Sequence, residues 1–354
     1  MKKVYAVDQN RNLNVELLRI FLTLTVCLHH FRMYSNALPY GGGYVAVDCF
    51  FIISGFYLAK HVMGNGSENI ENALQYIIQR YIRLFPEYFI AFSISLICRF
   101  IMNGVLPGNW MGYVKEMLMI EFWCLDSSER VNPPDWYCGY LLLASVIVFI
   151  YMKQIRKYKM PIYITGIMTT ALYVYLACYS SHINLYPQYR IGISIAIFRA
   201  LAGLLMGCLI YLLNYVRCND SNHEKSKFLY ILMVPLGIAL SYILLWENRL
   251  PYIDYAAIFF FALLFSFAVN MKRKKYNIYF EGVITYLGKM CFTVYLNHYI
   301  VAYVFAKYSL FRELDWKITS MLFLAGTFIF SYLIYQLINI IRLLIKTEIR
   351  DDKV

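Results

Sequence analysis

The chain contains 354 residues, of which 60% are hydrophobic and 15% are charged. Soluble domains carry about 25% charged residues, so this composition excludes a soluble globular protein and favours a chain embedded in a membrane. No polar block of domain size interrupts the apolar sequence, and we expect one transmembrane domain over residues 1–354. The net charge of +12 does not indicate nucleic-acid binding, because the basic residues are distributed as membrane topology requires.

Ten apolar segments are typical of transmembrane helices, which predicts an all-α polytopic fold. They lie at 13–31, 44–63, 87–104, 137–152, 160–180, 194–216, 228–246, 251–270, 284–306 and 318–341. With the N-terminus inside, 21 of the 33 basic residues fall in cytoplasmic segments and 8 in external ones. Basic residues accumulate on the cytoplasmic side, so we expect a cell-membrane protein with both termini in the cytoplasm. The first segment lacks a small-residue cleavage site and is not expected to be a cleaved signal peptide.

The first apolar segment carries a cation, Arg19, and a histidine, His30. A charged residue inside a bilayer costs at least ~2.5–3.5 kcal/mol, so it usually has a function. Eleven residues are close to three helical turns, which places Arg19, Thr23, Cys27 and His30 on one face. The first and last of these are then about 16 Å apart along the axis. This face is suited to binding an anion at one end and moving a proton at the other.

Asp48 is an acid near the outer end of the second segment, and two readings of it remain open. It could belong to a functional site, or it could pair with a cation such as Arg32 or Arg190 and stabilise the fold. Arg199, in the sixth segment, is a further in-membrane charge and a candidate anion contact. The ninth segment adds Lys289 and His298, and the histidine could orient a substrate hydroxyl together with that of the first segment.

Residues 73–85 predict an amphipathic helix at the inner interface, ended by Pro86 because proline cannot continue a helix interior. Arg80 and Arg83 are three residues apart and face one way, so they could grip a phosphate or rest on lipid headgroups. The external loop 105–136 is acidic and aromatic and ends at Trp136. Cys124 and Cys138 could pair there, and the nine cysteines show no metal-ligand spacing.

Four blocks in order resemble the membrane-bound acyltransferase 3 family. The run NLNVELLRIFLTLTVCLHH resembles its Arg, ten residues, His hallmark through Arg19 and His30. VAVDCFFIISGFYL and RYIRLFPEY resemble its second and third segments, and LGKMCFTVYLNHYIV resembles its closing block. Trp136 matches the central tryptophan. Leu141 departs from the glutamate of members with an appended esterase-like domain, so the short stand-alone branch is the better match. The likeness covers about residues 12–340.

This resemblance implies an O-acyltransferase that moves an acetyl group from cytoplasmic acetyl-CoA to a hydroxyl of a surface or exopolysaccharide glycan. His30 would be the base or acyl carrier, with Arg19 and Asp48 grouped with it as catalytic residues. Arg19, Arg80 and Arg83 would bind the acyl-CoA donor. Trp136 and His298 would bind the carbohydrate acceptor. The enzyme would work in the lipid bilayer and would need no metal. The alternative is a transporter or flippase of a glycan or small anion, which would predict internal repeats that the sequence does not display.

Overall fold

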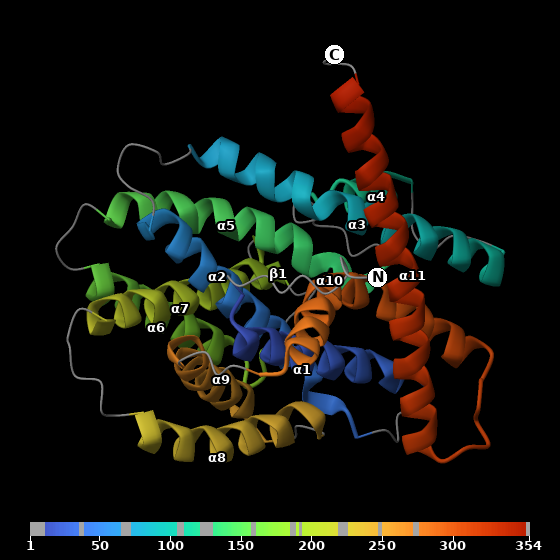
Figure 1. The fold of residues 1–354 in the computed structure, drawn as a ribbon. Coiled ribbons are helices and arrows are strands. Elements are labelled where there is room, and N and C mark those ends of the chain that lie inside the picture. Colours follow the sequence, from blue (N-terminus) through green and yellow to red (C-terminus); the bar gives the residue numbers. More distant parts are fainter. Residues whose placement is uncertain are drawn as a thin grey trace.

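The computed structural model describes residues 11–34, 39–64, 72–104, 110–120, 130–156, 161–184, 189–190, 193–218, 226–246, 250–271 and 276–351. Ten long helices dominate these residues (Figure 1): α1 (Leu13–Phe31), α2 (Ala46–Gly64), α3 (Ala73–Asn103), α5 (Trp136–Ile155), α6 (Pro161–Tyr179), α7 (Ile195–Cys218), α8 (Ser226–Leu245), α9 (Ile253–Asn270), α10 (Ile278–Lys307) and α11 (Trp316–Asp351). The shorter helices are η1 (Arg32–Tyr34), η2 (Gly41–Val45), α4 (Trp110–Met117) and η5 (Pro133–Asp135). Two-residue strands β1 (Tyr189–Arg190) and β2 (Ile193–Ser194) pair antiparallel.

The protein is an all-α polytopic membrane protein. Each of the ten predicted segments coincides with a long helix, and eight of these helices are long and apolar enough to cross a membrane. The two others are α8, whose described apolar part is only Met233–Leu245, and α10. Many large apolar side chains on these helices face outward, which is the expected arrangement where the solvent is lipid.

Helix α3 corrects the prediction for residues 73–85. The amphipathic segment does not end at Pro86 but continues as one helix of 31 residues through Asn103. Proline removes one backbone hydrogen bond, and transmembrane helices tolerate this loss because neighbouring groups satisfy the freed carbonyl. A helix of this length is about 46 Å long, longer than the ~30 Å hydrocarbon core. The basic first part of α3 and its apolar second part are therefore rigidly connected.

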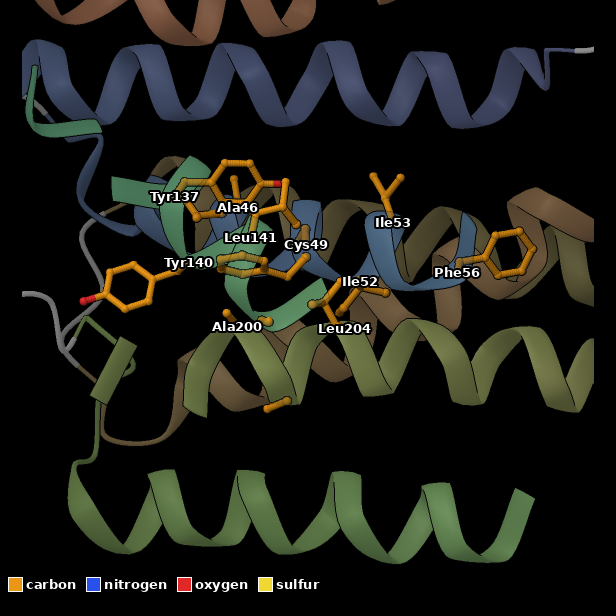
Figure 2. Close-up of a cluster of buried hydrophobic side chains, with 14 of the residues drawn as sticks. Ala46, Cys49, Ile52, Ile53, Phe56, Tyr137, Tyr140, Leu141, Ala200 and Leu204 are labelled. Atoms are coloured by element: carbon orange, nitrogen blue, oxygen red, sulfur yellow. The ribbon is translucent and has the colours of Figure 1, made fainter. Parts of the chain in front are cut away.

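The centre of the core is α2, which packs between α5 and α7 (Figure 2). Its apolar side chains pack against those of α5, where the rings of Phe51 and Tyr137 have centroids 4.7 Å apart. The α2–α7 contact is close because glycine lies on both helices. A Cβ atom on Gly55 would collide with the backbone of Leu204, and one on Gly207 would collide with that of Ile52. Small residues that allow backbones to approach are the usual basis of helix association in lipid.

A second packing unit joins α1 to α10, with α3 and α11 against the latter. Contacts at both ends establish that α1 and α10 run in the same direction: Glu16 of α1 meets Gly288, and His30 meets His298. Figure 1 shows α11 crossing the bundle at a steep angle and projecting beyond it at the C-terminal end. The two parts of the candidate site lie at the two ends of α1.

Candidate active site

Two histidines from distant parts of the sequence meet at the C-terminal end of α1. The Nδ1 atom of His30 is 3.0 Å from Nε2 of His298 and 3.2 Å from the carbonyl oxygen of Val26. The two rings have centroids 4.9 Å apart. His298 is completely buried, whereas His30 is partly exposed. The pair therefore has one enclosed member and one accessible member.

The hydrogen bonds determine which nitrogen of each ring carries the proton. Nδ1 of His298 faces the carbonyl oxygen of Tyr295, and because a carbonyl only accepts, this nitrogen must donate. In the neutral ring Nε2 of His298 is then an acceptor, so Nδ1 of His30 donates to it. This assignment also suits the Val26 carbonyl. It leaves the lone pair of His30 on Nε2, which is the atom available to a substrate.

The same arrangement separates the roles of the three nearby histidines. Both nitrogens of His298 are engaged, which leaves neither for a direct contact with an acceptor hydroxyl. His29 makes its hydrogen bond elsewhere: its Nδ1 lies 3.1 Å from the carbonyl of Tyr40, and its ring packs edge-on against those of His30 and Tyr44. This is the divergence expected for adjacent residues of a helix, about 100° apart.

The N-terminal end of α1 carries a cluster of charges. Asn12 caps the helix by accepting from the backbone N–H groups of Asn14 and Val15. Buried Glu16 then accepts from Arg11 at 3.0 Å and from Arg19 at 2.9 Å. One carboxylate thus orients two guanidinium groups, and Arg19 retains 25% of its side chain exposed.

Helix α3 brings its two arginines to the same cluster. Arg83 is exposed and within electrostatic range of Arg11, Arg19 and Arg80. Arg80 donates to the hydroxyl of Tyr76 at 2.7 Å, so its position is fixed. The structure therefore brings Arg19, Arg80 and Arg83 together, and their binding of an acyl-CoA donor stays a prediction.

Glu87 and Arg342 complete a cluster of seven charged residues, which we call the inner arginine cluster. Glu87 accepts from Thr293 at 2.9 Å and from Arg342 of α11 at 3.2 Å. Five cations and two anions leave an excess of three positive charges. An excess of this kind in one place attracts a polyanion. The members are Arg11, Glu16, Arg19, Arg80, Arg83, Glu87 and Arg342.

The α1 face between the two ends is a packing surface. Thr23 is 2% exposed and its hydroxyl donates to the carbonyl of Arg19. Cys27 is fully buried in a cluster with Phe31 and Met290. The shared face predicted from helical periodicity is correct, but at Cys27 it contacts α10. A bulky residue there would disturb this packing.

Asp48 has a partner that differs from the two expected from the sequence. Both of its oxygens accept from Arg199 of α7, at 2.8 and 2.7 Å, and both residues are buried. The side chain of Arg190 lies outside the described residues. Arg199 also stacks over the ring of Trp136, 5.2 Å from its centroid. The structure therefore joins Asp48, Arg199 and Trp136 in a buried assembly that links α2, α5 and α7.

Several residues of these sites were missed in the sequence. Glu16 had a local signal, because it precedes Arg19 by three residues and so shares its helix face. Glu87 and Arg342 had none, since they meet only through the packing of α3 with α11. Gly288 permits the close approach of α10, because a Cβ atom there would collide with the Glu16 carboxylate. Cys124 lies outside the described residues, so its pairing with Cys138 stays a prediction.

The comparison with known families settles the class of the protein. A family model described as an acyltransferase domain, Acyl_transf_3, matches residues 12–336. The chain belongs to the acyltransferase 3 family. No curated relative and no solved structure matches it.

In this membrane acyltransferase, Arg19 and His30 lie at the two ends of one helix, α1. The family match covers the His30–His298 pair and every member of the inner arginine cluster except Arg11 and Arg342. Within the described part of the chain, no three His, Cys, Asp or Glu residues are placed to hold a metal ion. Leu141, at the position of the glutamate found in some resembling proteins, is 4% exposed in the core between α2 and α5 (Figure 2).

Proposed function

We propose that this acyltransferase moves an acetyl group from cytoplasmic acetyl-CoA to a hydroxyl of a cell-surface glycan or its precursor. The observation that carries the proposal is the pairing of His30 with His298, at the opposite end of α1 from a cluster with excess positive charge. One end suits a polyanionic donor, and the other suits the activation of a hydroxyl.

The inner arginine cluster supports an acyl-CoA donor. Coenzyme A carries several phosphate charges, and planar guanidinium groups bind phosphate oxygens in a bidentate fashion. Arg19 and Arg83 retain exposed surface, so they remain accessible to a ligand. If the N-terminus is cytoplasmic, as the charge bias predicts, the cluster lies on the side where acetyl-CoA is made. The flexible arm of the donor would then extend along the bundle toward His30.

The lone pair on Nε2 of His30 supports general base catalysis. It would take the proton of the acceptor hydroxyl as the hydroxyl oxygen bonds to the thioester carbonyl carbon. The carbon–sulfur bond then breaks, and the proton passes from His30 to the departing thiolate. The products are the acetyl ester and coenzyme A with a free thiol. Direct attack by the same nitrogen, giving an acyl-histidine, is the other use of this lone pair.

The direct test is acetyl transfer by the full chain in lipid nanodiscs. Thiol release from acetyl-CoA and labelling of envelope glycan are measured together. His30→Ala should fold and lose activity by ~10²–10⁴-fold, the usual contribution of a general base, whereas His29→Ala should retain most activity. Full activity in His30→Ala would overturn the proposed chemistry.

The donor site is tested with the two arginines of α3. Arg80→Ala and Arg83→Ala should raise the KM for acetyl-CoA and leave the KM for the acceptor unchanged. Lys60→Ala is the matched control, because Lys60 is an exposed cation near the C-terminal end of α2. If the α3 variants alter only thermal stability, their arginines rest on lipid headgroups and the donor site lies elsewhere.

A further inference from the structure

Arg99 is a buried cation at the other end of α3 from the inner arginine cluster. Sixteen residues separate it from Arg83, which corresponds to about 24 Å along the helix. Arg99 is 8% exposed. Its guanidinium carbon lies over the rings of Tyr299 and Tyr303 of α10, at 5.6 and 5.1 Å from their centroids. It therefore belongs to the histidine end of the site.

Arg99 has no counter-charge in the part of the chain that the structure describes. The ion pairs among those residues do not include it, and its Nε is a buried donor without a hydrogen-bond partner. Arg19 and Arg199, by contrast, each pair with a carboxylate. Cation–π contacts return about 0.5–2 kcal/mol, but they use the ring faces and leave the planar N–H donors unused. An arginine in this state can bind a carboxylate or phosphate bidentately.

A single aromatic ring separates Arg99 from the catalytic histidine. The guanidinium of Arg99 lies over the ring of Tyr299. The same ring packs edge-on against the ring of His30, with centroids 5.7 Å apart. A tyrosine ring and a sugar ring are of similar width. A sugar whose hydroxyl reaches Nε2 of His30 would therefore place a charged substituent within the range of Arg99.

A second cation marks the same end of α10. The amine of Lys307 and the hydroxyl of Tyr303 both donate to the side-chain oxygen of Asn103, at 3.3 and 3.0 Å. Lys307 is exposed and is linked through Asn103 and Tyr303 to the buried arginine, so it adds a positive potential near that arginine. Two neighbouring cations attract an anionic ligand from solution more strongly than they attract a neutral one.

We propose that Arg99 is the anion contact of the acceptor site, and that the acceptor carries a carboxylate or phosphate next to the hydroxyl that is acylated. This inference rests on the proposed function and specifies its acceptor as an acidic sugar or a phosphate-linked sugar. A neutral glycan would leave the buried Nε donor of Arg99 unsatisfied, at a cost in affinity.

The test is ligand-dependent thermal stability of the full chain in phosphatidylcholine nanodiscs, with the inner arginine cluster saturated by coenzyme A. The probes are inorganic phosphate, glucuronate and neutral methyl glucoside. An anion at ten times its Kd should raise the melting temperature by about 2 °C or more. We expect phosphate or glucuronate, but not methyl glucoside, to have this effect on the wild-type chain.

The variants identify the site of binding. Arg99→Gln should abolish the anion effect, and Lys317→Gln, which removes an exposed cation at the start of α11, should retain it. Glucuronate acting alone indicates a carboxylate acceptor, and phosphate acting alone indicates a phosphate-linked one. The proposal is overturned if neither anion stabilises the wild-type chain, or if stabilisation survives Arg99→Gln. It is also overturned if phosphatidylglycerol in the nanodisc replaces the added anion, because the site then binds a lipid headgroup.

Failure of this inference is distinguishable from failure of the proposed function. Coenzyme A alone should stabilise the wild-type chain and Arg99→Gln equally, because Arg99 is remote from the inner arginine cluster. If coenzyme A has no effect on either, the donor assignment fails. If coenzyme A stabilises both but the anions do nothing, only the acceptor inference fails.

Discussion

Nε2 of His298 accepts a hydrogen bond from His30, and removing this acceptor should slow catalysis without weakening the binding of acetyl-CoA. His298→Leu places an apolar side chain of similar size in this fully buried position. It removes the acceptor for Nδ1 of His30. The inner arginine cluster is about three helical turns away along α1, so the KM for acetyl-CoA should stay the same. The change should therefore appear in kcat.

The expected size follows from the charge on His30. In the resting enzyme His298 accepts from a neutral imidazole, and such a bond contributes about 1 kcal/mol. When His30 gains the hydroxyl proton the same bond becomes charge-assisted and roughly twice as strong. The additional ~1–2 kcal/mol exists only in the transition state, and its loss corresponds to about a 5- to 30-fold fall in kcat. The Val26 carbonyl remains as a weaker second acceptor at 3.2 Å, which limits the loss.

The assay is thiol release from acetyl-CoA by the full chain in nanodiscs, with envelope glycan as the acceptor. His29→Leu is the matched control, because the hydrogen bond of His29 goes to the Tyr40 carbonyl and its ring only packs edge-on against those of His30 and Tyr44. The reasoning is refuted if His298→Leu is as inactive as His30→Ala, since His298 would then be the base itself. An unchanged kcat would refute it equally, because the hydrogen bond would have no role in the reaction.

Three further predictions concern the donor site, helix packing and topology. Arg19→Lys should fold, because lysine can still pair with the carboxylate of Glu16. It should raise the KM for acetyl-CoA about tenfold, because the planar guanidinium is lost. An unchanged KM would mean that the Arg19 side chain only extends to the membrane–water interface. Gly288→Val should lower thermal stability by an overpacking cost of about 1–3 kcal/mol, whereas Gly237→Val, whose added Cβ atom meets no neighbour, should cost less. Reporter fusions should read external at Asp126 and cytoplasmic at Lys274, and a cytoplasmic signal at Asp126 would contradict the ten-span topology.

Tertiary packing decided which charged residues are partners. The sequence suggested Arg32 or Arg190 as the partner of Asp48, whereas the bidentate partner is Arg199, 151 residues away. His298 could be placed in a membrane helix by composition, yet its hydrogen bonds to Tyr295 and His30 depend on how α10 is rotated against α1. Arg99 was visible only as one more charge within a span. Its lack of a counter-charge among the described residues is a property of the assembled helices.

The sequence alone determined the features that depend on short-range order. Hydropathy located all ten long helices, because a lipid solvent requires continuous apolar segments. Helical periodicity placed Arg19 and His30 on one face, because the rise and rotation per residue are constant. It misjudged Pro86, since whether proline ends a helix depends on the groups packed around the freed carbonyl. Lateral packing has no fixed period in the sequence, so the depth, rotation and neighbours of each helix were settled only in the folded structure.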